Sequence, residues 1–147
     1  MACCLNGVAE HQAELSLIIL AVSDLARSIE FYRGVFDWRQ TVETPFYVEF
    51  ELGPGLGVGL YQREGFARNV GQMPSPVPTG ELTSTEIYFR TQHPHKLIAK
   101  LDQVGARVLS PIALRDWDDE AAYFADPDGN VIVIASDGGG RIAQTKV

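Results

Sequence analysis

Three polar side chains stand at alternate positions of an otherwise apolar stretch: Glu86, Tyr88 and Arg90. Such alternation is typical of a β-strand, in which successive side chains point to opposite faces, so these three would share a face while Ile87 and Phe89 pack inward. Glu86 and Arg90 would lie about 13 Å apart along the strand, too far to form an ion pair directly. Because an unpaired buried carboxylate costs free energy, we predict that this strip binds a ligand.

The predicted ligand-binding set has three further members: Glu49, Tyr61 and Trp117. Glu49 lies in a regular alternation over residues 46–52, which places it on one face with Tyr47 and Glu51. Whether that polar face meets a binding cleft or bulk water stays open. Trp117 lies in an acidic loop before the seventh predicted strand, where it would offer an aromatic contact to a cation. A solvated acidic loop anchored by one tryptophan explains the same residues.

Glu86 is the candidate catalytic residue, since an apolar wall that raised its pKa would make it a general base. A neighbouring Arg90 or a buried hydrogen bond would explain Glu86 as well. The histidines His11, His93 and His95 share no predicted cleft strand with Glu86, so surface or capping roles are favoured over metal ligation. No Ser, Cys or His arrangement indicates a nucleophile with its base, and no glycine-rich phosphate loop follows a strand.

The elements that would position these residues occur twice in the same order. An apolar strand, a segment with helical spacing and three strand-like stretches fill residues 15–62, and the same order fills residues 82–137. The helical segments are residues 24–36 and 94–104, each with an apolar stripe that would pack against a sheet. We therefore predict an α+β fold of two βαβββ modules, whose uncovered sheet faces enclose a cleft.

Turn signals separate these elements at matching places. Residues 53–55 and 126–130 each join the third and fourth strands of a module, so Asp126 and Asp128 are interpreted as turn formers. Residues 63–81 are rich in Gly and Pro and form a connector, which is a linker and a candidate lid. Residues 1–14 and 138–147 are expected to be terminal tails.

Composition and charge narrow the function classes. The 147 residues are 46% hydrophobic and 21% charged, as in an ordinary globular protein. A net charge of −7 without any basic run argues against binding to nucleic acid. The longest apolar stretch, residues 15–22, is too short to span a membrane and lacks the flanks of a signal peptide. We expect a cytoplasmic protein with no membrane partner.

Several motifs resemble those of the vicinal oxygen chelate superfamily: Val22-Ser23-Asp24-Leu25, Arg27-Ser28-Ile29-Glu30-Phe31-Tyr32, Tyr123-Phe124 and Asp126-Pro127-Asp128-Gly129-Asn130. That superfamily includes glyoxalase I, extradiol dioxygenases, fosfomycin resistance enzymes, methylmalonyl-CoA epimerase and the bleomycin resistance proteins. The resemblance covers residues 15–137, which it implies form one domain of the glyoxalase/bleomycin resistance fold. These motifs are structural and do not select one function within the superfamily.

The resemblance also implies where a metal would be held. The positions that match the superfamily's metal ligands carry Leu17, Gly59, Glu86 and Val133. A divalent metal ion needs three or four His or carboxylate ligands, and a single carboxylate would bind one weakly. We therefore expect no metal and no cofactor.

Together these observations predict a metal-free protein that binds a small organic ligand in an apolar and acidic cleft, in the manner of the bleomycin resistance proteins. The alternative is a lyase or isomerase of the glyoxalase I type (lactoylglutathione lyase-like), with Glu86 as base or sole retained metal ligand. Because open sheets have edges to cover, we also expect a homodimer.

Overall fold

The computed structural model describes residues 12–137, which form two compact units. Of these residues, the first unit holds 12–25 together with Trp38–Pro74. The second unit holds Ala26–Asp37 and residues 75–137. No helix in the described part of the chain has the length and apolar character needed to cross a membrane.

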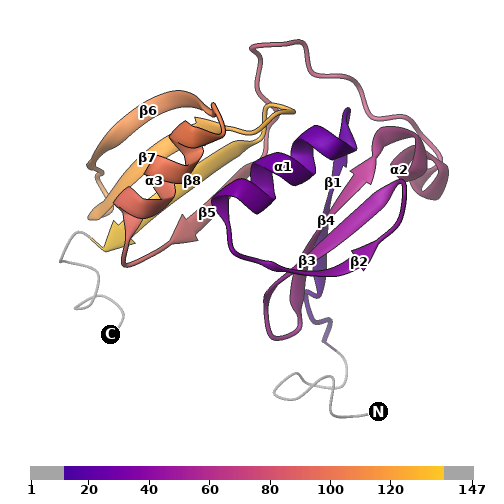
Figure 1. The fold of residues 1–147 in the computed structure, drawn as a ribbon, viewed down its shortest axis with the longest axis horizontal. Coiled ribbons are helices and arrows are strands. Elements are labelled where there is room, and N and C mark those ends of the chain that lie inside the picture. The colour runs from indigo at the N-terminus through magenta and orange to yellow at the C-terminus, as the bar shows by residue number, and fades with distance from the viewer. Residues whose placement is uncertain (1–11, 138–147) are drawn as a thin grey trace. The chain divides into compact units, whose positions relative to one another are not determined.

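The first unit is built on a four-stranded sheet in the order β1-β4-β3-β2 (Figure 1). Its strands are β1 (Leu17–Val22), β2 (Arg39–Glu43), β3 (Tyr47–Gly53) and β4 (Leu56–Gln62). β1 pairs in parallel with β4, and the other neighbours are antiparallel. α2 (Arg63–Val70) follows β4 directly and ends at Gly71.

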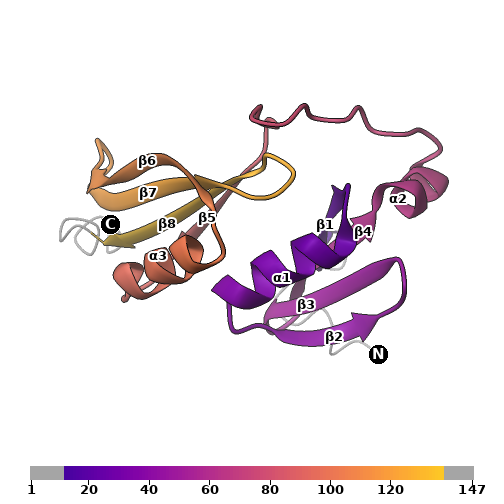
Figure 2. The same ribbon diagram turned by 45° about the horizontal axis from the view of Figure 1, so that its top comes forward.

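The second unit repeats this plan in the order β5-β8-β7-β6 (Figure 2). Its strands are β5 (Glu86–Arg90), β6 (Arg107–Leu114), β7 (Asp119–Ala125) and β8 (Val131–Asp137). Again the first strand pairs in parallel with the last, and the remaining pairs are antiparallel. The equal strand orders confirm the predicted doubling and the α+β class.

Alternation along the strands separates the two faces of each sheet, as predicted. In the first sheet Val48 and Phe50 are buried, while Tyr47, Glu49 and Glu51 are half-buried on the other face. In the second sheet Ile132 and Ile134 are buried on one face, which α3 (Pro94–Gln103) covers (Figure 1). Val133 and Ala135 lie on the opposite face, together with Ala121 and under Tyr88, Tyr123 and Val131.

All but the first residue of the helix α1 (Leu25–Val35) belongs to the second unit, which the sequence pattern did not predict. Phe36, just after the helix, has its ring centroid 4.5 Å from that of Phe89 in β5. The Tyr32 hydroxyl donates to Asp126 at 2.6 Å. Tyr32 and Phe36 of the predicted apolar stripe therefore contact residues more than fifty positions later in the chain.

The turn at residues 126–130 has the predicted role. Asp126 Oδ1 accepts hydrogen bonds from the backbone N–H groups of Asp128 and Asn130. Gly129 adopts φ 86°, and a Cβ atom there would come within 2.5 Å of the Glu81 carbonyl oxygen, so this position requires glycine. Asp126 is thus a turn former, and it is also the acceptor for Tyr32.

The connector, predicted as a linker and a candidate lid, begins with a helix that the sequence pattern did not predict. Residues 63–70 form α2, while residues 73–78 have no regular structure. The glycines and prolines that suggested a linker lie mostly after Gly71, where the helix ends in a left-handed cap. The sequence signal for a linker therefore applies to the second half of this segment.

Candidate functional site

The pairing of three strands in the second unit brings the predicted polar strip into register with β8 and β7. Tyr88 pairs with Val133, which pairs with Tyr123. Arg90 pairs with Ala135, and Ala135 pairs with Ala121 in the next row. Because pleated neighbours in one row point to the same side, these side chains share one sheet face. We call this surface, formed by Tyr88, Arg90, Trp117, Asp119 and Tyr123, the aromatic face.

A buried carboxylate holds the centre of the aromatic face. Asp119 Oδ2 accepts hydrogen bonds from the Tyr88 hydroxyl at 2.6 Å and from Arg90 Nη2 at 3.2 Å. Trp117 Nε1 donates to the Tyr88 hydroxyl oxygen at 2.8 Å. The Arg90 guanidinium also lies 5.0 Å from the centre of the Tyr88 ring. Three predicted ligand-binding residues, Tyr88, Arg90 and Trp117, are therefore joined through one acid.

The electrostatics of this group follow from its burial. Asp119 is fully buried, whereas the side chain of its counterion Arg90 is 46% exposed. Desolvation and the hydrogen bond to Asp119 raise the pKa of Tyr88, while the Trp117 and Arg90 contacts oppose that rise. Tyr88 therefore stays protonated near neutral pH and acts as a hydrogen-bond donor to the carboxylate.

The hairpin turn between β6 and β7 positions Trp117 and Asp119. Arg115 N–H donates to the Asp119 carbonyl at 2.8 Å, and Asp118 N–H donates to the Arg115 carbonyl at 3.0 Å. Asp118 has φ 75°, a left-handed conformation that few residues other than glycine, asparagine and aspartate adopt. The acidic loop expected around Trp117 is thus a tight turn, and its last acid, Asp119, is not solvated.

A second arginine lies over the other tyrosine of this face. The Arg115 guanidinium is 4.9 Å from the centre of the Tyr123 ring. Its Nη2 and Nε donate to the Ala121 carbonyl at 2.7 and 3.1 Å, and Nη2 also donates to Ser110 Oγ and the Pro111 carbonyl. Desolvation and the negative charge of Glu86 raise the pKa of Tyr123. Each tyrosine of the face is therefore paired with one guanidinium.

Glu86 lies on the same side of β5 but outside the Asp119 cluster. It is exposed, and among the described residues its side chain forms no hydrogen bond or ion pair. The carboxylate partner of Arg90 is Asp119, one of the acids around Trp117 for which a solvated loop was one of two explanations. Glu86 is therefore accessible as a base or ligand contact.

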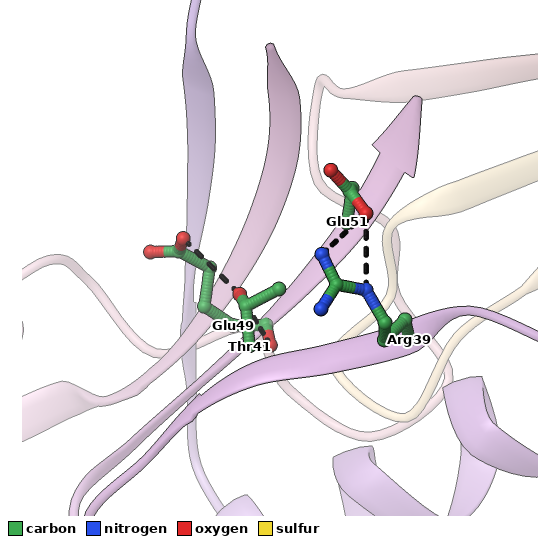
Figure 3. Close-up of polar contacts among 4 residues, drawn as sticks. All are labelled: Arg39, Thr41, Glu49 and Glu51. Atoms are coloured by element: carbon green, nitrogen blue, oxygen red, sulfur yellow. Dashed lines mark hydrogen bonds and ion pairs between the residues drawn. The ribbon is translucent and has the colours of Figure 1, made fainter. Parts of the chain in front are cut away.

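Glu49 and Tyr61 belong to the first unit, whereas the aromatic face belongs to the second. The ring centroids of Tyr47 and Tyr61 are 5.0 Å apart, and the Tyr47 hydroxyl donates to Glu49 Oε1 at 2.6 Å. Burial and this hydrogen bond raise the pKa of Tyr47. Figure 3 shows the adjacent polar contacts, in which Thr41 Oγ1 donates to Glu49 and the Arg39 guanidinium meets Glu51.

The four positions that match the superfamily's metal ligands do not form a metal centre here. A Cβ atom on Gly59 would lie 2.4 Å from the Tyr47 hydroxyl oxygen, so Tyr47 fills the space above that position. Val133 is fully buried. Across residues 12–137 no three His, Cys, Asp or Glu side chains are grouped as metal ligands. His93 and His95 lie exposed at the start of α3, and His11 is outside the described residues.

Asp119, Tyr123 and Arg115 are members of this site that the sequence pattern did not predict. Asp119 comes directly after residues 116–118, which are acidic or aromatic, so polarity alone makes the whole stretch look like a solvated loop. The usable signal was the spacing of Asp119, Ala121 and Tyr123, which share one face of a strand.

Comparisons with known proteins agree with this architecture. Residues 15–137 match the family described as Glyoxalase-like domain. A glyoxalase-related enzyme from Fulvimarina pelagi is similar in structure, with a TM-score of 0.75 and 21% identity, over 86% of this chain and 89% of that one.

Two further solved structures are similar over most of their length. A glyoxalase/bleomycin resistance protein/dioxygenase from Nocardioides has a TM-score of 0.72 and 22% identity, over 92% of this chain and 90% of that one. A lactoylglutathione lyase from Agrobacterium tumefaciens has a TM-score of 0.65 and 16% identity, over 90% and 98%. At these identities the likeness establishes a common fold.

Proposed function

This chain belongs to the glyoxalase-like domain family, within the vicinal oxygen chelate superfamily, and we propose that it binds a small organic ligand on the aromatic face without a metal ion. The observation that carries the proposal is the fully buried Asp119, held by Tyr88 and by a half-exposed Arg90.

A carboxylate buried beneath a half-exposed counterion is a poor way to stabilise a small sheet. Desolvating such a charge often costs more free energy than its ion pair contributes, and an apolar group of similar size would stabilise the sheet as well or better. The layer beneath the face, Ala121, Val133 and Ala135, is already apolar. The polar cluster above it is therefore better explained by recognition of a ligand than by folding.

The exposed parts of the cluster suit a small organic molecule. Trp117 is 43% exposed and is tied to Tyr88 by its indole N–H, so its ring is both accessible and oriented. Aromatic side chains held in this way supply contact area at a small entropic cost, and Arg90 adds a hydrogen-bonding edge. Tyr88, Arg90 and Trp117 are accordingly the residues that we assign to the ligand.

Binding can be tested through the intrinsic fluorescence of Trp117. The chain has two tryptophans, so a Trp38→Phe background leaves Trp117 as the single reporter. A library of small aromatic and aliphatic compounds is screened against the Trp38→Phe protein by fluorescence and by ligand-observed NMR. We expect hits whose binding is lost in Tyr88→Ala and kept in Phe46→Ala, a matched change of an exposed aromatic residue in the first unit. Compounds that bind Tyr88→Ala as tightly as the unchanged protein, or a screen without hits, would refute the proposal.

The absence of a metal is a separate part of the proposal. Leu17, Gly59 and Val133 supply no ligand atoms, and Tyr47 fills the space above Gly59. We expect protein purified without chelator to carry far less than one transition metal ion per chain. Elemental analysis that found a near-stoichiometric metal, lost in Glu86→Gln, would contradict this.

A lyase or isomerase of the glyoxalase I type is the second candidate, and the accessibility of Glu86 favours it. Its carboxylate is exposed beside Tyr123 and has no protein partner in residues 12–137. A general base needs such a carboxylate within reach of the substrate proton. Turnover of the hemithioacetal of methylglyoxal and glutathione, abolished by Glu86→Gln and retained by Glu120→Gln, would establish this activity.

We also propose a cytoplasmic homodimer. Each sheet has two edge strands, β1 and β2 in the first unit and β5 and β6 in the second, and pairing with a second copy is one way to cover such edges. Sedimentation equilibrium should give twice the chain mass of 16.1 kDa, and a concentration-independent mass of one chain would contradict the dimer.

A further inference from the structure

We infer that the ligand of the aromatic face is a small organic anion, whose carboxylate is bound by the Arg90 guanidinium while its flat body lies against Tyr88 and Trp117. The inference rests on the proposed function and adds to it the charge and chemical class of the ligand.

The geometry of Arg90 is that of an oriented anion receptor. One nitrogen, Nη2, is anchored on the buried Asp119, and the guanidinium lies over the Tyr88 ring at 5.0 Å. Its Nε and Nη1 groups donate to no acceptor in the described part of the chain, and the side chain is 46% exposed. A guanidinium fixed on one side offers its other donors as a planar fork, which matches a carboxylate in two parallel hydrogen bonds.

The local charge also favours an anion at this end of the face. Asp119 balances Arg90, but the hydrogen-bond partners of Arg115 are all neutral: the carbonyls of Pro111 and Ala121 and the hydroxyl of Ser110. Arg115 reaches the Ala121 carbonyl, in the row that also contains Arg90. The Arg115 guanidinium lies over Tyr123 of β7, which is separated from β5 by one strand, so Arg115 adds positive charge to the side of the face opposite Arg90.

The acids that face this region do not reverse that balance. Glu86 lies about 13 Å from Arg90 along β5, at the far end of the face. Asp116 and Glu120 are exposed at the hairpin, and Asp118 is half-buried in the same turn. Asp137 pairs with Asp119 and lies on the same side of the sheet as Arg90, but its side chain is exposed, so water screens it as it screens Asp116 and Glu120. The net charge of −7 disfavours non-specific anion binding, so selective binding of an anion would identify a built site.

Three probes of one shape and different charge test the inference: benzoate, benzyl alcohol and benzylamine. Each is titrated into the Trp38→Phe protein with Trp117 fluorescence as readout, and acetate is added as the same anion without an aromatic body. We expect benzoate to bind more tightly than the other three. The affinity for benzoate should fall at least about tenfold in Arg90→Gln, since a charge-assisted bidentate contact is lost.

Matched variants separate recognition from folding. Arg39→Gln removes an exposed arginine of the first unit that is paired with Glu51, and it should leave benzoate binding unchanged. If Arg90→Gln does not fold because Asp119 is left without its counterion, Arg90→Gln with Asp119→Asn removes both charges together. This double variant should fold and still lose selectivity for benzoate.

The outcomes also distinguish this inference from the proposed function. If benzylamine or benzyl alcohol binds more tightly than benzoate, and this binding is lost in Tyr88→Ala, the ligand is not an anion. The assignment of the ligand site to the aromatic face would still hold. Benzoate binding that is unchanged in the Arg90 variants would overturn the role of Arg90. If neither the probes nor the compound library bind, the proposed function fails and this inference fails with it.

Discussion

In the first unit the ion pair Arg39–Glu51 joins side chains that are 72% and 39% exposed, whereas in the second unit Arg90–Asp119 joins one that is 46% exposed to one that is fully buried. The two pairs lie on sheets with the same strand order. A repeated backbone plan therefore carries two different kinds of polar chemistry, one on a wetted surface and one built into the sheet.

The polar tyrosines show the same contrast. Tyr47 donates to Glu49, which is half-buried and lies next to Thr41, so water can replace part of this contact. Tyr88 donates to Asp119, where no water reaches the acid, and also accepts from Trp117. We take the depth of the acid as the feature that marks the second unit as the ligand-binding one.

The largest expected effect tests this difference in depth directly. Arg90→Ala should lower the free energy of unfolding by roughly 3 kcal/mol, because it leaves a buried carboxylate without its counterion. Arg39→Ala should cost less than about 1 kcal/mol, as is usual for an exposed ion pair. Urea unfolding of both variants measures the two values, and equal losses would show that burial of Asp119 does not distinguish the units.

A smaller effect is expected at Gly59 in the first sheet. A Cβ atom there would lie 2.4 Å from the Tyr47 hydroxyl oxygen, so Gly59→Ala should cost about 1–3 kcal/mol of stability by displacing that ring. Gly53→Ala is the control, because an added Cβ meets nothing within 4 Å at that position. If Tyr47→Ala does not relieve the cost of Gly59→Ala, Tyr47 is not what closes this position.

The sequence predicted the fold well because its signals are local. Alternation in the segments containing Val48 and Phe50, and Ile132 and Ile134, is enough to assign strands and their buried faces. The turn formed by Asp126 and Gly129 was predicted for the same reason, since its hydrogen bonds join residues at most four apart. Local periodicity does not determine which helix contacts which strand, so the contact of Phe36 with Phe89 was missed.

The site was predicted only in part, because its central residue depends on pairing between distant strands. Tyr88 and Arg90 could be predicted from the alternation in their strand, and Trp117 from its place among acidic residues. Asp119 looked like one more acid in a hydrophilic loop, and its burial depends on the turn at Asp118 and on contacts with residues about thirty positions earlier. Sequence patterns carry little information about such contacts.

Removing single hydroxyl groups sharpens the comparison between the two tyrosines. Tyr88→Phe should cost about 1–2 kcal/mol, because a buried acid loses a donor and Trp117 loses its acceptor. Tyr47→Phe should cost about 0.5 kcal/mol or less, because water can reach Glu49. Thermal and urea unfolding give both values, and a larger loss for Tyr47→Phe would place the more important polar contact in the first unit.

The smallest expected effect comes from the two matching turns, of which residues 53–55 contain no acid and residues 126–130 contain the buried Asp126. Burial raises the pKa of Asp126 above its ordinary value of 3.8, while hydrogen bonds from Tyr32, Asn130 and the turn backbone lower it. Burial is the larger cause, so the pKa is raised on balance. The folded protein then binds this proton more tightly than the unfolded chain does. The resulting stability is fully present below the unfolded pKa and is lost as pH rises through the folded pKa.

Asp126→Asn removes that titration and therefore tests its sign. We compare the free energy of unfolding of the wild type and of this variant in steps from about pH 3 to about pH 6, the range around an ordinary aspartate pKa. The wild type should lose stability relative to the variant as the pH rises, on top of a constant cost, because the asparagine amide would face the Tyr32 and Asn130 donors. Asp102→Asn, an exposed acid in α3, removes a carboxyl group without touching the turn and serves as the control. A difference that stays constant with pH would mean that the hydrogen bonds balance burial at Asp126 and that the second turn is no more pH-sensitive than the first. A difference that changes in the opposite direction would mean that the hydrogen bonds outweigh burial.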